Sequence, residues 1–597
     1  MKLCLRLPFN HYQFSNLSLT EVRVNDPLTL RTFAMPTDAL TKEELQKMAD
    51  PTLGGTIGET MALPEADRFS ADDEKFIKFH GIYQQDDRDL RKTGKKYIMM
   101  IRARITGGIV SAEQYLAFDD LATRHANDTL RITSRQTFQW HGVVKSGLGP
   151  LMKGLNDALV STIAACGDVN RNVLAPSTPS ISPLTDLVQA DARRVSDALL
   201  PQTKAYHEIW VNGGPLKLTP EQKLAFEDPL YRRSYLPRKF KVAFAIPPLN
   251  DTDIFANCLG FAAIADPANP ARLLGYNVLC GGGLGMSHGN EATFPRAADV
   301  LGFIPADRVV ETAKAVLIAF RDHGDRTNRK HARLKYVLAD KGPAWFRAEV
   351  EQRAGFKLEP ARAAVFTKQG DLFGWHRQSD GRWFLGMYVE TGRIKDTPER
   401  RLKTALRSVV TEFRPEVRLT TSQNLILAGI PEEQREAINR RLADHGVPVD
   451  RQVAAVRLNS MACVSMPTCG LALAESERVF PQLLDRLEGL FAELGLGDED
   501  IVVRMTGCPN GCARPYLAEI GLVGRAPGKY NLHLGGVFAS TRINRVYRES
   551  VKFDDIIAEL RPLLARWKQE RLPGERFGEF VDRAVLPPEV SPAKSAA

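Results

Sequence analysis

Residues 131–136 of this chain read Arg-Ile-Thr-Ser-Arg-Gln, and residues 418–423 read Arg-Leu-Thr-Thr-Ser-Gln. A glycine follows each stretch at the same distance, Gly142 in the first copy and Gly429 in the second. The segments before them also agree in kind, because each predicts a strand, a turn and a helix. Two copies so far apart predict an internal duplication rather than a solenoid, whose repeats are much shorter. We therefore predict two α+β half-domains that pair around a pseudo-twofold axis.

Within the first copy, the apolar pattern predicts a strand over 97–105, interrupted by Arg102 and Arg104 and ended by a turn at Gly107-Gly108. A helix is predicted from about Ala112, and a strand over 130–142. The copies differ where chemistry would differ, as Arg135 and His141 of the first correspond to Ser422 and Ala428 of the second. This difference indicates that one copy keeps anion-binding side chains and the other is structural.

Four cysteines form two pairs near the C-terminus, Cys463 and Cys469, then Cys508 and Cys512. Leucines at helical spacing over 483–494, ended by Gly495, predict a helix between the pairs, and residues 501–503 predict a short strand. Such a segment would bring the second pair back to the first. Four thiolates can hold an iron–sulfur cluster. The wide first pair favours a cluster, while a zinc site or unliganded thiols remain the alternatives.

Lys239 and Lys241 precede a predicted strand over 242–246. In extended backbone their side chains point to one face, so two ammonium groups would converge. Such a pair is unfavourable without an anion between it. Lysines also commonly protect a solvated sheet edge, and the pattern alone does not choose between these interpretations.

The stretches around the cysteines, CVSMPTC (463–469) and TGCPNGCARPYLAEIGLVG (506–524), resemble the siroheme- and cluster-binding motif of assimilatory sulfite and nitrite reductases. The resemblance runs from about residue 75 to about residue 580. It implies a [4Fe–4S] cluster on the four cysteines, with Cys512 also ligating the siroheme iron. It also implies duplicated ferredoxin-like half-domains with pseudo-twofold symmetry and two α/β domains that bind siroheme and the cluster.

The resemblance further implies roles for individual side chains. Four cationic residues would surround the substrate anion: Arg102, Arg171, Lys239 and Lys241. The remaining siroheme contacts would come from Arg131, Thr133, Arg135, Gln139, His141, Arg333 and Asn510. Family members often carry Lys at the position of Arg333. This chain therefore departs from the family there: the charge is kept, but the geometry of the contact with a siroheme carboxylate changes. A basic cluster formed by Arg326, Arg329, Lys330 and Arg333 is also compatible with a solvated helical face.

Six domain segments are predicted. They are an N-terminal extension and arm (1–75), the first half-domain (76–150), a siroheme- and substrate-binding domain (151–345), the second half-domain (346–432), a cluster- and siroheme-binding domain (433–585) and a tail (586–597). Residues 36–75 are polar and predict an extended arm. The first 34 residues are interpreted as an extension upstream of a start at Met35, with an organelle transit peptide as the alternative.

Composition excludes several classes of protein. The formal net charge of +9 over 597 residues is modest, and no basic tract favours nucleic acid. No apolar run is long enough for a membrane span, and a secretory signal is not evident, so we expect a cytoplasmic protein. Eight cysteines in so long a chain do not make a disulfide framework. Cys4, Cys166, Cys258 and Cys280 stand singly and are expected to be buried apolar residues.

Together these features predict an enzyme that reduces sulfite to sulfide on siroheme coupled to a [4Fe–4S] cluster. Side chains supply no electrons, so the redox chemistry must belong to cofactors. The alternatives are a nitrite reductase of the same family, in which the position of Lys241 is usually Asn, a non-catalytic iron–sulfur electron carrier, and a zinc-stabilised nucleic-acid-binding protein. No nicotinamide or flavin signature is present. A partner is therefore expected to deliver electrons, either an NADPH-dependent flavoprotein subunit or a ferredoxin.

Overall fold

A computed structural model describes residues 39–214, 218–447, 449 and 453–588. The predicted extension, the start at Met35 and Cys4 lie outside these residues, as does most of the predicted tail. The chain divides into two units, residues 1–40 and 41–597, and every element below belongs to the second. No helix in the described ranges is long and apolar enough to cross a bilayer.

The segment predicted as an extended arm contains helices instead. They are α1 (Lys42–Ala49), α2 (Ile57–Ala62) and α3 (Asp73–Phe79). The prediction was wrong because a few apolar side chains, among them Ile57 and Phe76, are buried and hold this polar segment on the rest of the protein. The buried Lys47 ammonium also donates to the Leu236 carbonyl at 2.8 Å, which ties α1 to the central region.

The first half-domain is a sheet covered by two helices. Its elements are β1 (Ile82–Asp86), β2 (Tyr97–Arg102), β3 (Ile109–Val110), α4 (Ala112–His125), β4 (Leu130–Ile132), β5 (Phe138–Val143) and α5 (Lys145–Asp157). The helix predicted from Ala112 is confirmed. The single strand predicted over 130–142 is two antiparallel strands, because Gln136 adopts a φ of 52° and turns the chain between them.

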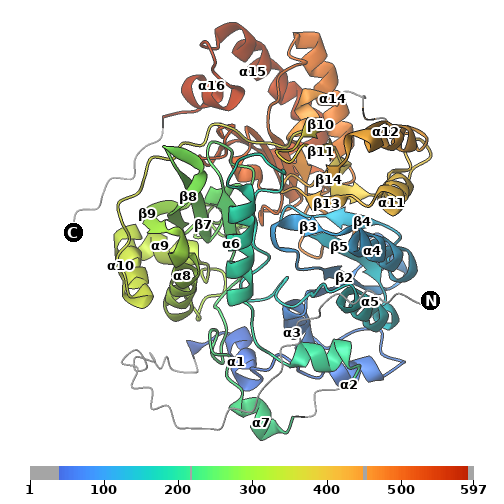
Figure 1. Ribbon diagram of the computed structural model, residues 1–597, viewed down its shortest axis with the longest axis vertical. Helices are drawn as coiled ribbons and strands as arrows, with labels where there is room; N and C mark the ends of the chain where they lie inside the picture. The colour runs from blue at the N-terminus through green and yellow to red at the C-terminus, as the bar shows by residue number, and fades with distance from the viewer. Residues whose placement is uncertain (1–38, 215–217, 448, 450–452, 589–597) are drawn as a thin grey trace, which may run out of the picture. The chain divides into compact units, whose positions relative to one another are not determined.

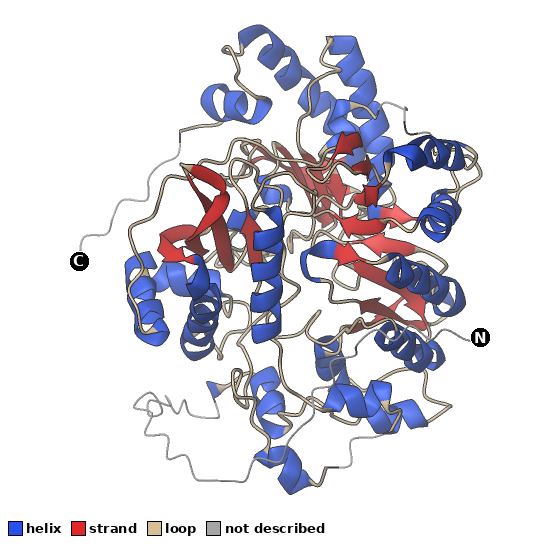
Figure 2. Ribbon diagram, in the orientation of Figure 1, coloured by secondary structure: helices blue, strands red, loops and turns tan. Residues whose placement is uncertain are grey.

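The second half-domain repeats this order. Its elements are β10 (Gly374–Arg377), β11 (Trp383–Met387), β12 (Arg393–Ile394), α11 (Leu402–Phe413), β13 (Glu416–Leu419), β14 (Leu425–Ile430) and α12 (Arg435–Ala443). Helices α4, α5, α11 and α12 lie along the same side of the two sheets (Figure 1). Figure 2 shows the strands of the two halves as neighbouring sheets.

The two halves exchange a strand reciprocally. One sheet has the order β1-β2-β5-β4-β12 and the other β10-β11-β14-β13-β3, so the fifth strand of each comes from the other copy. The turns before β3 and β12 need glycine, since a Cβ at Gly108 would lie 2.5 Å from the Leu419 carbonyl oxygen. A Cβ at Gly392 would lie 2.6 Å from the Ile132 carbonyl oxygen, at the equivalent place in the other half. The predicted duplication with pseudo-twofold pairing is confirmed.

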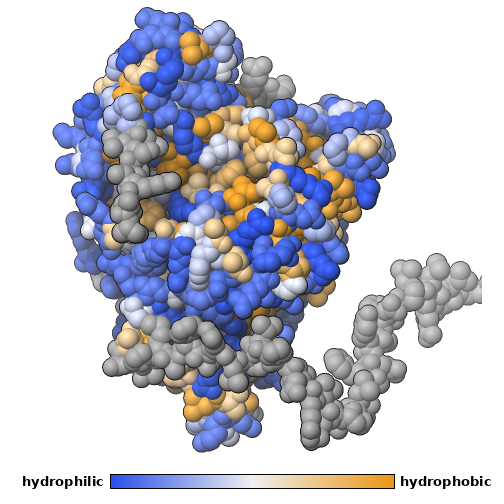
Figure 3. All heavy atoms as spheres, turned by 90° about the vertical axis from the view of Figure 1, so that its left-hand side faces the viewer, coloured by the Kyte–Doolittle hydropathy of each residue, from blue (hydrophilic) through white to orange (hydrophobic). Residues whose placement is uncertain are grey.

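The central region is a four-stranded sheet with helices packed on it. Strand order is β6-β7-β8-β9, and β6 lies parallel to β7. The elements are α6 (Thr185–Ala198), α7 (Pro220–Ala225), β6 (Val242–Ala245), β7 (Leu259–Asp266), β8 (Asn269–Cys280), β9 (Asp299–Pro305), α8 (Val309–His323), α9 (Leu334–Lys341) and α10 (Pro343–Ala354). On the face that Figure 3 shows, apolar side chains gather over the middle of a mostly hydrophilic surface.

The C-terminal region is a second mixed sheet of order β15-β16-β17-β18-β19. Its elements are α13 (Ala455–Leu458), β15 (Met461–Ala462), α14 (Phe480–Leu494), β16 (Val503–Thr506), β17 (Ile520–Ala526), β18 (Lys529–Leu534), β19 (Arg545–Lys552), α15 (Ile556–Glu570) and α16 (Phe577–Ala584). The predicted helix is confirmed, and Gly495 ends it with a φ of 64°. The strand predicted over 501–503 begins at Val503.

Short 3-10 or π turns connect several of these elements. They lie at Arg91–Thr93, Thr106–Gly108, His207–Val211, Ile254–Ala256, Ala306–Arg308, Glu390–Gly392, Glu432–Gln434, Pro515–Leu517 and Phe553–Asp555.

Candidate functional site

The two cysteine pairs meet at one edge of the C-terminal sheet. Strands β15 and β16 are parallel, with Ala462 opposite Met505, so their carboxyl ends lie at the same edge. Cys463 directly follows β15, and Cys508 lies two residues after β16. The Cys463 amide donates to the Met505 carbonyl at 3.2 Å, and the Gly507 amide donates to the Cys463 sulfur at 3.3 Å. Parallel pairing therefore joins two motifs that are distant in sequence.

The loops that carry the cysteines depend on close packing. A Cβ at Gly507 would overlap the Ser465 hydroxyl and the Ala474 carbonyl, so only glycine fits there. The Asn510 side-chain amide donates to the Cys508 sulfur at 3.5 Å. Hydrogen bonds of this kind to a ligand sulfur tune the potential of a cluster. The Ser134 hydroxyl donates to the Cys512 carbonyl at 2.9 Å, so the first half-domain contacts this loop directly.

The four sulfurs influence one another electrostatically. Burial, followed by the charges of Cys512 and Cys508, raises the pKa of Cys469 to about 11. Burial and the same neighbours raise the pKa of Cys463 further. Without a metal these thiols stay protonated, whereas bound iron stabilises the thiolate that acts as the ligand.

A single zinc ion and a cluster place different demands on four cysteines. Four sulfurs about 2.3 Å from a single zinc ion would lie only about 4 Å from one another. Among the described residues no three His, Cys, Asp or Glu side chains are arranged to hold one metal ion. Cys463, Cys469, Cys508 and Cys512 offer the four sulfur donors that a [4Fe–4S] cluster requires. The three singly placed cysteines in the described ranges, Cys166, Cys258 and Cys280, are buried as predicted.

A group of cationic side chains lies next to the cysteines. Residues 170–174 run beside 240–244, and the Arg171 amide donates to the Phe240 carbonyl at 2.9 Å. This pairing puts Arg171 beside Lys239 and Lys241. Arg102 ends β2 and contacts the Cys166 sulfur at 3.1 Å. Its Nε donates at 3.1 Å to the Gln139 carbonyl oxygen in the amide orientation that satisfies both groups.

The two lysines lack acidic partners. Burial, then Arg333, Arg238 and Arg171, lowers the pKa of Lys239 to about 7. Burial, then Arg135, Lys239 and Arg333, lowers the pKa of Lys241 well below its usual value. Within the ranges that the structure describes, neither ammonium group makes a hydrogen bond or an ion pair. These residues are half-buried, so they do not form the solvated sheet edge that was the alternative interpretation.

The other predicted siroheme contacts divide into two groups. Arg135 and Arg333 are partly unsatisfied, because the Nε of each is buried without a hydrogen-bond partner in the described part of the chain. Arg135 also donates to the Asn257 side chain at 2.9 Å, and its amide donates to the Thr133 hydroxyl at 3.2 Å. The Arg135 guanidinium also donates to the Asn172 and Val242 carbonyls, so its Nε is the nitrogen that no described residue contacts. Such free guanidinium nitrogens suit the carboxylates of a macrocycle.

Arg131 and His141 form the second group. Arg131 makes an ion pair with Glu477 at 2.8 Å and donates to the Ala462 carbonyl at 2.8 Å. Its guanidinium group is therefore already hydrogen-bonded to the protein. His141 is buried near the same pair, and burial, then Arg393, lowers its pKa well below the usual value. Both side chains therefore interact with other parts of the protein next to the site. Whether they also contact siroheme stays a prediction.

In the basic cluster near residue 330, Lys330 is exposed, but the arginines are not a solvated face. Arg326 makes an ion pair with the buried Glu44, and Arg329 makes one with the buried Asp168 at 2.9 Å. Sequence reasoning did not single out Lys335, whose ammonium donates to the Gly285 carbonyl at 2.8 Å and holds the glycine-rich segment 281–285. Its position two residues after Arg333 was the available signal.

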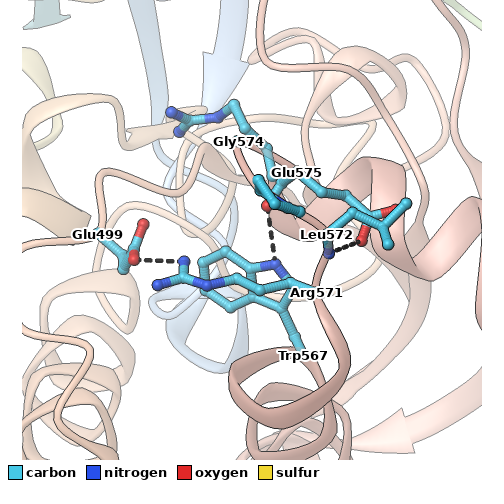
Figure 4. A pocket seen from close by; sticks show the side chains of 8 residues that line it. Glu499, Trp567, Arg571, Leu572, Gly574 and Glu575 are labelled. Carbon is cyan, nitrogen blue, oxygen red and sulfur yellow. Dashed lines mark hydrogen bonds and ion pairs between the residues drawn. The ribbon is translucent and has the colours of Figure 1, made fainter.

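A separate cavity of about 520 Å³ contains none of the predicted site residues. It is lined by Glu499, Trp567, Arg571, Leu572, Pro573, Gly574, Glu575 and Arg576 (Figure 4). The Arg571 guanidinium lies 4.7 Å from the Trp567 ring centre and 2.5 Å from a Glu499 oxygen. These contacts pair Arg571 at the α15–α16 turn, while the Nε of Arg576 is buried without a hydrogen-bond partner in the described chain.

Comparison with known proteins agrees with this geometry. A family model described as the nitrite and sulphite reductase 4Fe-4S domain matches residues 190–358, which include Lys239, Lys241 and Arg333. A model of the nitrite/sulfite reductase ferredoxin-like half domain matches twice, at residues 91–158 and 376–445. A Myxococcus xanthus protein named sulfite reductase [NADPH] hemoprotein beta-component is 47% identical over 93% of this chain and 99% of its own length. The chain belongs to the nitrite and sulphite reductase family.

Two further proteins are similar over nearly the whole chain. A Chromohalobacter salexigens protein of the same name is 49% identical and covers 92% of this chain and 96% of its own length. The solved structure of the Mycobacterium tuberculosis NirA protein is 25% identical, with a TM-score of 0.73 over 91% of this chain and 96% of that one. The α+β fold with its two half-domains is thus the fold of the family.

Proposed function

We propose that this protein is an assimilatory sulfite reductase hemoprotein, which reduces sulfite to sulfide with six electrons. The observation that carries the proposal is a cationic site beside the four cysteines, in which Arg171 is buried and Arg102, Lys239 and Lys241 are half-buried. An anion must neutralise this site, because the described part of the chain places no carboxylate on the lysines. The cysteines supply thiolates for a cluster beside it.

The side chains have separate tasks in this proposal. When bound, siroheme and a [4Fe–4S] cluster on Cys463, Cys469, Cys508 and Cys512 supply the electron-transfer chemistry, with Cys512 shared between them. Arg135 and Arg333 hold the carboxylates of siroheme. The guanidinium groups of Arg102 and Arg171 orient the substrate and stabilise the negative charge on its oxygens.

Lys239 suits proton transfer as well as binding. Its pKa of about 7 means that its Nζ can hold a proton and release it near neutral pH. An oxygen leaving sulfite as water needs protons, and in this proposal Lys239 and Lys241 deliver them. An anion in the site raises both pKa values again, because its charge favours the ammonium form.

Nitrite reduction is the second candidate, since the family contains both activities in its name. Lys241 favours sulfite, because the more highly charged anion gains more from a second ammonium group beside Lys239. Both substrates require the same cofactors, so spectra alone do not separate them.

Electrons come from a partner protein in this proposal. The chain carries no nicotinamide-binding signature, while relatives of the same length are named as components of an NADPH enzyme. The partner is therefore an NADPH-dependent flavoprotein, with a ferredoxin as the alternative donor.

The test is an optical spectrum with metal analysis of protein from a siroheme-competent host. We expect a Soret band, a band in the red region, and about four cluster irons plus one siroheme iron per chain. Cys280→Ser is the matched control, because Cys280 is a buried cysteine that belongs to neither pair, and it should retain this spectrum. Stoichiometric zinc without iron would refute the proposal, and a broad cluster absorption without a Soret band would indicate an electron carrier.

A further inference from the structure

The loop between β1 and β2 is seated on the loop that carries Cys469. The Arg88 amide donates to the Pro467 carbonyl at 3.2 Å. Its guanidinium donates to the Ala472 carbonyl at 2.7 Å and to the Cys469 carbonyl at 3.4 Å. Asp89 makes an ion pair with Arg478 at 2.6 Å on the same side. Residues 87–96 therefore form the outer surface next to one predicted cluster ligand.

Two leucines are exposed at this place. Leu471, two residues after Cys469, is 67% exposed, and Leu90 is 42% exposed. Single exposed leucines are ordinary on protein surfaces, so exposure alone indicates nothing. These two, however, belong to the two loops that Arg88 holds together, and they lie directly outside the cysteine loop. An apolar contact here would exclude water from the outer side of the loop that carries Cys469.

The rim of this surface carries free positive charge. Asp86 pairs with Tyr97 across the hairpin, so residues 95 and 96 return beside the start of the loop. Two of the three nearby carboxylates are paired, Asp86 with Arg91 and Asp89 with Arg478, while Asp87 makes no ion pair within the described residues and accepts from the Asp89 amide. Lys92, Lys95 and Lys96 are exposed, and none makes an ion pair with the residues that the structure describes. Three lysines thus remain available to a partner.

We propose that Leu90, Leu471, Lys92, Lys95 and Lys96 form the docking surface for the electron donor, a flavoprotein with an acidic face around its flavin. This inference rests on the proposed function, because only a cluster enzyme needs such a donor. Small interfaces with an apolar centre and a charged rim suit transient electron-transfer complexes. Complementary charge accelerates such encounters and sets their orientation.

The redox step at this surface moves electrons only. A reduced flavin docked here would give up one electron at a time, and a cluster held by Cys469 and the other three cysteines would accept each of them. No covalent bond forms or breaks between the two proteins, and the flavin releases its own protons to water. Six such transfers accompany each sulfite.

The test uses the holoenzyme and the purified flavoprotein component of a bacterial NADPH sulfite reductase. Reversing the three charges (Lys92→Glu, Lys95→Glu and Lys96→Glu) should weaken the Kd for the flavoprotein at least about tenfold at low ionic strength. The salt dependence of the Kd should decrease as well. The control variant reverses three other exposed cations without ion pairs, Arg193→Glu, Lys204→Glu and Lys314→Glu. An equal loss in both variants, or none in the first, would overturn the proposal.

A second variant tests the apolar centre. Leu471→Ser should weaken the Kd several-fold without changing its salt dependence, whereas Leu159→Ser, at a leucine 90% exposed elsewhere, should leave it unchanged. Flavoprotein binding unaffected by Leu471→Ser would overturn the role of Leu471. Binding of a ferredoxin instead of the flavoprotein through the lysines would overturn the choice of partner.

Turnover with reduced methyl viologen, a small donor that needs no docking surface, separates the two proposals. Sulfite reduction by every variant should match the wild type in this assay. A wild-type protein that does not reduce sulfite with viologen would refute the proposed function. Normal viologen turnover with unchanged flavoprotein binding in the charge-reversed variant would refute only the docking surface.

Discussion

Replacing Lys239 by Met should stabilise the protein that lacks siroheme, although it removes a residue proposed to act in catalysis. Burial and neighbouring cations hold the pKa of Lys239 at about 7, against 10.5 for an unperturbed lysine. Folding below pH 10.5 therefore opposes protonation of this side chain. The penalty is greatest below about pH 7 and disappears as the pH rises towards 10.5.

The size of this penalty follows from the shift. At about 1.4 kcal/mol per pKa unit the full difference corresponds to about 5 kcal/mol. Lys239 is only half-buried, and water that enters the site screens its charge, so we expect about 1–3 kcal/mol at pH 7. Methionine fills a similar volume and carries no charge, which should recover that amount.

Urea unfolding of protein made with and without siroheme measures the effect. Without siroheme, Lys239→Met should be more stable than wild type at pH 7, and the advantage should decrease steadily towards pH 9.5. With siroheme bound, the advantage should be smaller, because the carboxylates of the cofactor attract the ammonium group. Lys314→Met, at an exposed lysine of α8, is the control and should change little. A difference independent of pH, or a less stable variant at pH 7, would refute the reasoning.

Three other predictions concern selectivity, the cluster and the half-domains. Lys241→Asn should lower kcat/KM for sulfite about ten- to a hundredfold, and for nitrite much less, because it removes one charge-assisted contact; equal losses with viologen as donor would show that Lys241 does not discriminate. Cys512→Ser should lose electron transfer to substrate and bound iron, as measured by turnover and iron content, and full sulfite reduction would exclude its bridging role. Fragments 75–150 and 346–430 should not fold alone, since each lacks the fifth strand of its sheet; a cooperative melt of a monomeric fragment would contradict this.

The sequence predicted the parts of the fold that are duplicated and the helix whose apolar residues recur at regular helical spacing. The duplicated motif at 131–136 and 418–423 was sufficient to predict two paired half-domains, and leucine spacing located α14. The strand exchange could not be predicted, because β3 and β12 have two residues each and carry no alternating pattern. The helices of the arm were missed for a related reason, since tertiary contacts fix them despite a polar sequence.

In the candidate site, too, some features could be predicted from the sequence and others could not. Cysteine spacing indicated a cluster, and parallel strands then bring the pairs together. Charge patterns alone could not tell Lys241, which lacks an acidic partner in the described chain, from Arg329, which pairs with Asp168. That distinction depends on which buried carboxylates the fold delivers, and those come from distant segments.

The exchanged strands also constrain the order in which the chain can fold during synthesis. Strand β4 leaves the ribosome roughly 260 residues before β12, the strand that completes its sheet. At about 5–20 residues per second, that edge waits roughly 13–50 s for its partner. The central region emerges meanwhile and can fold first, next to an incomplete sheet with an open edge. A chaperone that shields β4 during this interval would increase the yield of native enzyme more than one that acts after release.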